Sequence, residues 1–506
     1  MRLPRLILIS LFSTCASAQD LTAPTDDPWF IAAQETFAAK RAVKPNKRKA
    51  KNVILFVADG MGPTTVTAAR IFDGQSRGEE GEENFLSFEE FPHIAMAKTY
   101  NTNAQTPDSA GTMSAIVTGV KTKAGVISMS DKAIRGRCTG VDAARVATLG
   151  EFAEAAGLAT GVVSTARLTH ATPAAVYAHS PDRNWESDGS LPEQATAAGC
   201  VDIAQQLIDF PYGDGLEVAM GGGRSNFLPD NVADPEDADS KGRRRDGRNL
   251  VEEWKAKSEN HVFVYDQAGF DALGDDARVL GLFERSHMKY EADRENDAGG
   301  EPSLAEMTAK AIDILSRDKD GFFLMVEAGR VDHAHHGGNA ARALRDTQAF
   351  SEAVATARAM TNSRDTLIIA TADHGHTLAF QGYPVKGNNI LGLANAFFSR
   401  PPAGANTALA GDGKPYTTLS YANGPGSVFV GDDWKEGRPA PTAEEVADVN
   451  YRQQAIIPSP SETHGGQDVT IYADGPHAYL FDGVVEQNYV FHVIYEAMRL
   501  QKRRGD

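Results

Sequence analysis

Residues 322–336 read Phe-Phe-Leu-Met-Val-Glu-Ala-Gly-Arg-Val-Asp-His-Ala-His-His, an apolar run followed at once by acidic and histidine side chains. The apolar part, residues 322–326, is typical of a strand that is buried on both faces of a sheet. Asp332 and His336 stand four residues apart, so one turn of helix would place them on one face. A carboxylate and an imidazole at this spacing favour a divalent metal such as zinc, although the stretch alone also fits a polar loop with hydrogen-bonded histidines.

Two further apolar runs end in the same kind of residue. Residues 53–57 lead to Asp59, and residues 366–370 lead to Asp373 and His374. Strands alternate with helical patterns along the chain, which predicts an α/β fold: a large, mostly parallel central sheet with helices on both faces. Because the carboxyl ends of parallel strands gather at one edge, we expect these side chains to meet there.

The remaining patterns predict the domain organisation. Residues 1–18 have the positive start, apolar core and small cleavage-site residues of a secretory signal peptide. Residues 19–50 form a polar N-terminal arm with an amphipathic piece near Trp29 and a basic run that we interpret as a solvated linker. Residues 51–506 form the main domain. Within it, periodicity is lost from about 382 to 460, which indicates a small irregular insertion standing off the sheet.

The composition of the chain argues against some classes of function. A net charge of −18 and a pI near 5.2 argue against non-specific nucleic-acid binding, and an anionic substrate would need local cations to hold it. After the signal, only Cys138 and Cys200 remain. Two cysteines in an exported protein most simply form one disulfide, with two free thiols as the alternative. The last residues, 499–506, lack the hydrophobic tail of a lipid-anchored protein.

Ser109 and Arg183 are candidate phosphate-handling residues. Ser109 precedes a helical apolar stripe, so it would stand at a helix N-terminus, where free N–H groups and the dipole favour anions. An ordinary helix cap is the alternative interpretation. Arg183 can form two parallel hydrogen bonds to phosphoryl oxygens. A two-metal centre beside a serine and an arginine fits phosphoryl transfer.

The acidic and imidazole residues suit three cations. Unpaired carboxylates at one sheet edge would repel one another, and cations relieve that repulsion. With His464 added, the ligand count suits two zinc-like ions. Asp59, Thr172 and Glu327 offer the oxygen ligands that magnesium prefers.

Taken together, these stretches resemble the motifs of alkaline phosphatases in order and spacing, from about residue 50 to the C-terminus. Each motif is weak alone, and jointly they are specific. The segments that carry the resemblance are Asp59-Gly-Met-Gly, Pro107-Asp-Ser-Ala-Gly, Asp332-His-Ala-His-His, Ala372-Asp-His and Glu462-Thr-His-Gly-Gly.

The resemblance implies hydrolysis of phosphate monoesters to an alcohol and inorganic phosphate, at alkaline pH, through a phosphoserine on Ser109, with Arg183 clamping the phosphate. The resemblance and the N-terminal arm suggest a homodimer. The signal peptide, with the lack of a hydrophobic C-terminal tail, implies a free periplasmic or secreted enzyme without a membrane anchor. The implied ligands are Asp332, His336 and His464 for a first zinc, Asp59, Asp373 and His374 for a second, and Asp59, Thr172 and Glu327 for magnesium.

Other residues are similar to one branch of the family. His170 and His333, expected beside the magnesium, resemble the vertebrate branch and some marine bacterial members, as does a disulfide between Cys138 and Cys200. The vertebrate branch also has a calcium site, which this chain matches in part and with Asp297 a residue or two out of register, so calcium is left open. The similar residues are Glu236, Phe283, Glu284 and Asp297.

Three other classes of protein account for fewer of these sequence motifs. A sulfatase needs Cys/Ser-x-Pro-x-Arg, which Ser109-Ala-Gly-Thr-Met does not supply. A phosphodiesterase of the same superfamily generally uses threonine and lacks a counterpart of Arg183. A zinc-storing protein would explain the histidines but neither Ser109 nor Arg183.

Overall fold

The structure is a computed structural model that describes residues 23, 25–395, 407–429 and 437–503. The predicted signal peptide, residues 1–18, lies outside the described residues. The chain divides into two units between Lys44 and Pro45. In the first, helix α1 (Pro28–Ala42) is capped by the Asp27 carboxylate, which accepts the N–H groups of the first helical turn. No α1 side chain is buried.

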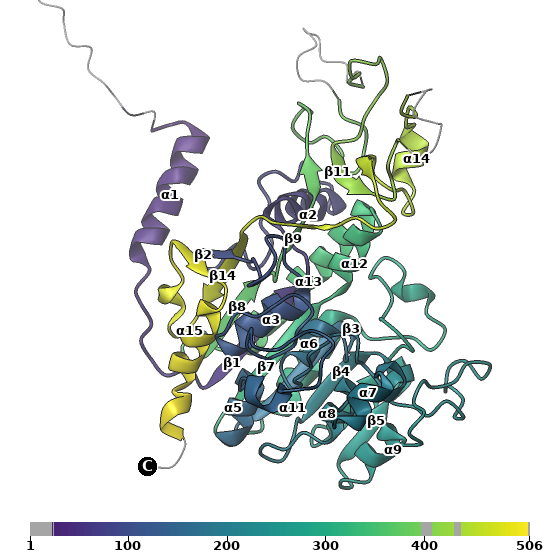
Figure 1. Cartoon of the computed structure of the whole chain (residues 1–506). Coiled ribbons are helices and arrows are strands. Elements are labelled where there is room, and N and C mark those ends of the chain that lie inside the picture. Colours follow the sequence, from purple (N-terminus) through teal and green to yellow (C-terminus); the bar gives the residue numbers. More distant parts are fainter. Residues whose placement is uncertain (1–22, 24, 396–406, 430–436, 504–506) are drawn as a thin grey trace, which may run out of the picture. The chain divides into compact units, whose positions relative to one another are not determined.

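The second unit is built on a ten-stranded sheet with the order β15-β2-β14-β8-β1-β7-β3-β4-β6-β5 (Figure 1). Every adjacent pair in it is parallel except the two that involve β14. Its strands are β1 (Asn52–Ala58), β2 (His93–Lys98), β3 (Ala159–Arg167), β4 (Val218–Gly222), β5 (His261–Val264), β6 (Arg278–Leu282), β7 (Phe322–Ala328), β8 (Thr366–Thr371), β14 (Val469–Asp474) and β15 (Val484–Glu486). The predicted mostly parallel sheet is confirmed.

The central strands are apolar because helices cover both faces. All side chains of β7 and β8 are buried, as expected for strands in the middle of such a sheet. Helices α11 and α13 pack on each other and on β7, while α5 and α15 contact the central strands as part of another helix group that includes α3. The helices are α2 (Pro63–Ser76), α3 (Ser109–Thr118), α4 (Val141–Ala144), α5 (Leu149–Ala155), α6 (Ala171–Ala174), α7 (Glu193–Ala197), α8 (Ile203–Ile208), α9 (Leu250–Lys255), α10 (Gln267–Asp271), α11 (Leu304–Leu315), α12 (Arg330–His336), α13 (Ala340–Met360), α14 (Ala443–Ala447) and α15 (Tyr489–Met498).

One stretch with a helical sequence pattern contains a break. The sequence pattern over residues 143–156 suggests a single helix, but in the structure residues 145–148 separate α4 from α5. The reason is a capping box: the Thr148 hydroxyl accepts the Glu151 N–H, and the Glu151 carboxylate accepts the Thr148 N–H. This reciprocal pair starts a new helix at Leu149.

A small three-stranded sheet overlaps the region in which an insertion is expected. Strand β10 (Leu378–Phe380) pairs antiparallel with β11 (Leu419–Gly424), which pairs parallel with β12 (Ala455–Pro458). Strands β11 and β12, with α14, fall within residues 382–460, where the sequence shows little periodicity. Parts of this segment, 396–406 and 430–436, lie outside the described residues.

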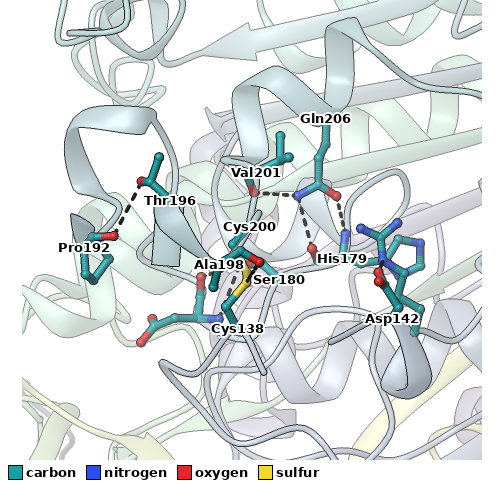
Figure 2. The surroundings of a disulfide bond; sticks show 12 residues. Cys138, Asp142, His179, Ser180, Pro192, Thr196, Ala198, Cys200, Val201 and Gln206 are labelled. Atoms are coloured by element: carbon teal, nitrogen blue, oxygen red, sulfur yellow. Dashed lines mark hydrogen bonds and ion pairs between the residues drawn. A yellow bond between two sulfur atoms is a disulfide. The ribbon is translucent and has the colours of Figure 1, made fainter. Parts of the chain in front are cut away.

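The predicted disulfide is present. Cys138 and Cys200 are bonded, with their Cα atoms 5.8 Å apart, and close a loop with a sequence separation of 62 (Figure 2). Beside the disulfide, the Gln206 side chain of α8 bonds both the N–H and the C=O of His179 and also the C=O of Val201. These contacts fix the backbone at His179, shortly before Arg183. Among the described residues, no helix has the length and apolar character required to cross a membrane.

Candidate metal centre

Three adjacent strands bring the acidic residues together. Strand β1 lies between β7 and β8, and Val57 is in register with both Glu327 and Thr371. Asp59, Glu327 and Asp373 therefore emerge at the same edge of the sheet, and all three are fully buried. The acidic side chains that follow these strands thus meet at one edge of the sheet, as expected for parallel strands.

Ser109 is the first residue of α3 and faces this edge. The cap of α3 is not Ser109 but Asp108, whose carboxylate accepts the Gly111 N–H at 3.1 Å. The serine hydroxyl therefore does not cap the helix and instead contacts the candidate ligands. Its Oγ lies 3.2 Å from His374 Nε2 and 3.4 Å from Asp59 Oδ1. The helix dipole adds positive potential at this position.

Asp59, Asp373 and His374 form the first of three ligand groups. His374 Nε2 lies 3.3 Å from Asp59 Oδ1 and 3.5 Å from Asp373 Oδ2. Asp373 is held in place by the Gly60 N–H and the Thr112 hydroxyl, each at 3.1 Å. One nitrogen and two carboxylates at this spacing fit a zinc ion.

Asp332, His336 and His464 form the second group. Asp332 Oδ1 lies 3.3 Å from Nε2 of both histidines. The Nδ1 atoms of the two rings face the backbone carbonyls of Glu462 and Pro107, at 2.5 and 2.7 Å. Because a carbonyl only accepts, Nδ1 of each neutral ring carries the proton, and the two Nε2 lone pairs face each other at 3.1 Å. A cation between them removes that repulsion, so this group also fits zinc.

The third group contains Asp59, Thr172 and Glu327. Thr172 Oγ1 lies 3.5 Å from Asp59 Oδ2. Glu327 Oε2 accepts the Ser164 hydroxyl, while Oε1 is buried and has no partner among the described residues. Asp59, Glu327 and His170 have ligand atoms within 4.8 Å of one another. The unpartnered oxygen and the oxygen-rich donors fit magnesium.

Arg183 borders this third group. Its Nη1 donates to Asp108 at 3.2 Å, and its Nη2 donates to His170 Nε2 at 2.9 Å. Burial opposes the positive charge, but Asp108 and Asp59 outweigh it and raise the pKa of Arg183. His333 lies beside His170, with ring centroids 5.4 Å apart, and burial lowers its pKa to about 3. Both rings are therefore neutral neighbours.

The raised pKa values of the buried carboxylates indicate that the site needs additional positive charge. Burial, with neighbouring carboxylates such as Asp373, raises the pKa of Asp59 well above its ordinary value. Burial also raises the pKa of Glu327 to about 8. Carboxylates crowded in this way ionise at neutral pH only when positive charge is supplied.

Two supporting residues received no role in the sequence analysis. His376 Nε2 lies 2.8 Å from Asp332 Oδ1, and its Nδ1 lies 2.5 Å from Glu462 Oε2. Burial lowers the pKa of His376, but these two carboxylates outweigh burial and raise it to about 9. The contact arises because β9 (Gly375–His376) pairs with β13 (His464–Gly465). The only sequence signals are the spacings of two residues from His374 to His376 and from Glu462 to His464.

The residues similar to a calcium site lie elsewhere and partly converge. Glu284 and Asp297 both contact the Lys289 ammonium, and Glu236 contacts Arg224. A fourth carboxylate, Glu301, which no sequence pattern singles out, lies beside them and accepts the Lys289 backbone N–H at 2.8 Å. Phe283 is fully buried in the hydrophobic core.

Comparisons with known proteins agree with this geometry. The family model described as "Alkaline phosphatase" matches residues 50–500. The tissue-nonspecific alkaline phosphatase of Gallus gallus is 43% identical over 511 residues, covering 98% of this chain and 94% of the relative. The alkaline phosphatase of the Antarctic bacterium TAB5 has a TM-score of 0.60 at 21% identity, covering 90% of this chain and 99% of its own. That of Thermus thermophilus has a TM-score of 0.63 at 24% identity, covering 92% and 95%.

Proposed function

The chain belongs to the alkaline phosphatase family and hydrolyses phosphate monoesters, and we propose that Ser109 is its nucleophile and Arg183 its phosphate clamp. One observation carries the proposal: Ser109 Oγ lies within 3.4 Å of both Asp59 and His374, at the start of a helix. Phosphoryl transfer needs a nucleophile at a point of concentrated positive charge. The family is metal-dependent, and the three ligand groups are where that charge would reside.

The proposed ligand sets follow these groups. Asp332, His336 and His464 would hold one zinc ion, Asp59, Asp373 and His374 a second, and Asp59, Thr172 and Glu327 a magnesium ion. When bound, these ions lower the pKa of a hydroxyl or water and neutralise the oxygens of the phosphoryl group. His376 keeps Asp332 oriented through its bond to Oδ1, and Glu462 orients His376 in turn.

In the proposed reaction, Ser109 Oγ attacks phosphorus in line, the bond between phosphorus and the alcohol oxygen breaks, and the alcohol leaves. Water then attacks the seryl phosphate, which releases inorganic phosphate and restores Ser109. Arg183 holds two phosphoryl oxygens with its fork of N–H donors in both steps. Two in-line displacements predict net retention of configuration at phosphorus.

The decisive experiment compares Ser109→Ala with Ser114→Ala, a serine of the same helix whose hydroxyl bonds the Ala110 carbonyl. Purified proteins are assayed with p-nitrophenyl phosphate, and their zinc and magnesium contents are measured. We expect Ser109→Ala to lose at least a thousandfold in kcat while its metal content stays normal, and Ser114→Ala to keep turnover. Near-normal turnover of Ser109→Ala contradicts the proposal, as does faster hydrolysis of bis-p-nitrophenyl phosphate than of the monoester.

Further proposals concern assembly and location. We propose that residues 1–18 are removed during export to the periplasm or the medium, and that the enzyme is a homodimer. The domain limits proposed are an arm over residues 19–50 and a catalytic domain over 51–506 with its insertion near 382–460. Exposed apolar side chains on α1, such as Trp29 at 68% and Phe37 at 67%, support an arm that contacts another surface. Sedimentation of the full chain and of a chain starting at Pro45 tests the dimer.

A further inference from the structure

A cavity of about 490 Å³ lies beside Arg183, outside the three ligand groups. Asn184, the residue after Arg183, and Glu186 form part of its wall. The Thr169 hydroxyl donates to the Glu186 carboxylate at 2.6 Å. The next residue, His170, accepts a hydrogen bond from Arg183 Nη2 at 2.9 Å. These contacts hold the cavity wall in a fixed position relative to the proposed phosphate clamp.

The cavity and the metal centre lie at the same edge of the sheet. Loops that follow β3 and β4 line the cavity, whereas Asp59 and Glu327 lie at the ends of β1 and β7. The four strands are parallel and adjacent in the order β1-β7-β3-β4. Neighbouring strands lie about 4.8 Å apart, so two to three spacings separate the cavity from the metal centre by roughly 10–15 Å. One extended small molecule can therefore reach both.

Two arginines on the cavity wall lack a carboxylate partner. Arg243 and Arg245 line the cavity, and neither guanidinium forms an ion pair or a hydrogen bond with another described residue. Arg244, between them, is fully buried and makes two hydrogen bonds to Asp202, each at 3.0 Å. Arg244 also forms a β-bridge with Pro229, so the chain is extended there. Since alternate side chains of an extended chain point to opposite sides, Arg243 and Arg245 share the side that faces the cavity.

The backbone that carries the two arginines is fixed on both sides. The Arg243 N–H donates to the Ser225 carbonyl at 2.8 Å, and the Arg245 N–H donates to the Asp188 carboxylate at 2.8 Å. The arginines are thus positioned before any ligand arrives, which lowers the entropic cost of binding.

The carboxylates of the cavity wall do not neutralise both arginines. Glu186 is already paired with Arg167, whose Nε and Nη2 donate to it at 2.7 and 2.6 Å. The second lining carboxylate, Asp230, can offset only one charge. One positive charge therefore remains in excess, in a chain whose acidic residues outnumber basic ones by 68 to 50. The exposed amide of Asn184 adds neutral N–H donors.

We propose that this cavity is a second anion subsite, which binds a second phosphate group on the alcohol part of a substrate while Arg183 holds the phosphate that is cleaved. A guanidinium binds phosphate oxygens through two parallel hydrogen bonds. The inference rests on the proposed function, because Ser109 and Arg183 define where the first phosphate lies. It names a substrate class: bisphosphates whose two phosphate groups are separated by roughly 10–15 Å.

The first test compares α,ω-alkanediol bisphosphates with ω-hydroxyalkyl monophosphates of equal chain length, from the propanediol to the dodecanediol compounds. Initial phosphate release gives kcat and KM. In the wild type we expect the longer bisphosphates to exceed their monophosphates at least tenfold in kcat/KM, chiefly through KM, because charged hydrogen bonds are gained. The shortest should show only the twofold advantage that two equivalent phosphates give.

Replacing both arginines, Arg243→Gln with Arg245→Gln, should remove the advantage of the longer bisphosphates. The matched control is Arg48→Gln with Arg364→Gln, which removes the same charge from exposed side chains at the opposite edge of the sheet and should keep the advantage. A wild-type advantage no larger than twofold at every length overturns the proposal, as does an advantage that survives in the Arg243 and Arg245 variant.

The second test needs neither a variant nor turnover, so its failure is distinct from a failure of the proposed function. The wild-type holoenzyme is treated with phenylglyoxal, which modifies arginine, in the presence of decane bisphosphonate or of ω-hydroxydecyl monophosphonate. The carbon–phosphorus bonds of both compounds resist hydrolysis, and peptide mass spectrometry quantifies each arginine. We expect the bisphosphonate to slow modification of Arg243 and Arg245 at least fivefold relative to the monophosphonate, and to leave Arg364 unchanged. Equal rates at Arg243 and Arg245 with the two compounds overturn the proposal.

Discussion

Replacing Arg183 by lysine tests the phosphate clamp, because lysine keeps the charge and removes the fork. A guanidinium has five N–H donors. In Arg183 one of them bonds Asp108 and one bonds His170, which leaves three for the substrate. An ammonium has three donors on one atom and cannot reach Asp108 and two phosphoryl oxygens together. Arg183→Lys thus loses one charge-assisted hydrogen bond, worth about 1.5–3 kcal/mol.

That free energy corresponds to a loss of roughly 10- to 150-fold in kcat/KM. The assay measures kcat/KM for p-nitrophenyl phosphate together with the inhibition constant of inorganic phosphate, which has the same oxygens and should weaken in parallel. The control is Arg135→Lys, an exposed arginine whose Nε lies 3.4 Å from Asp182. If Arg183→Lys stays within threefold of the wild type in both measurements, Arg183 does not clamp the phosphate.

Three further predictions concern magnesium, the disulfide and pH. His170→Asp adds a negative charge beside Glu327 and should tighten magnesium binding at least tenfold, since about 1.4 kcal/mol suffices; an unchanged magnesium titration would contradict this. Cys138→Ser with Cys200→Ser opens a loop with a separation of 62 residues and should lower the free energy of unfolding by about 4 kcal/mol, measured in urea without reductant. Burial and Glu217 raise the pKa of Glu154 to about 8, so its stabilising effect is full below the unfolded pKa near 4.5 and is lost as pH rises through 8. Glu154→Gln should flatten the fall in unfolding free energy between pH 6 and pH 9, and an identical fall in the variant refutes it.

The central strands and the residues at their ends could be predicted because local sequence patterns determine them. Residues 53–57, 322–326 and 367–370 are apolar, and each run lies in a central strand of the sheet. Since such strands end at one edge, the residues that follow them could be placed together without coordinates. Ser303 and Glu306 also form a capping box, a local sequence pattern that marks the start of α11.

What could not be predicted depends on contacts between distant segments. His376 meets Asp332 and Glu462 only because two strands of two residues each pair across a separation of 88 positions, His376 with His464, and strands so short have no periodicity. The sequence does not predict strands β11 and β12, because Gly, Pro and Asn interrupt the alternation of apolar and polar residues. The break between α4 and α5 is different, because Thr148 and Glu151 carry a capping-box signal that can be read in the sequence.

The two acidic clusters described above receive positive charge in different ways. At the sheet edge, Asp59 and Asp373 are buried where no lysine or arginine forms an ion pair with them among the described residues, and burial raises the pKa of both, so bound cations are needed to supply the charge. Folding and metal binding are then coupled, and the metal-free enzyme must either protonate these carboxylates or lose stability. At the second cluster, Lys289 contacts Glu284 and Asp297, so the chain supplies a positive charge of its own there. A catalytic site cannot use that solution, because a tethered ammonium lying among the ligands would occupy the place where Ser109 and the phosphoryl group must meet.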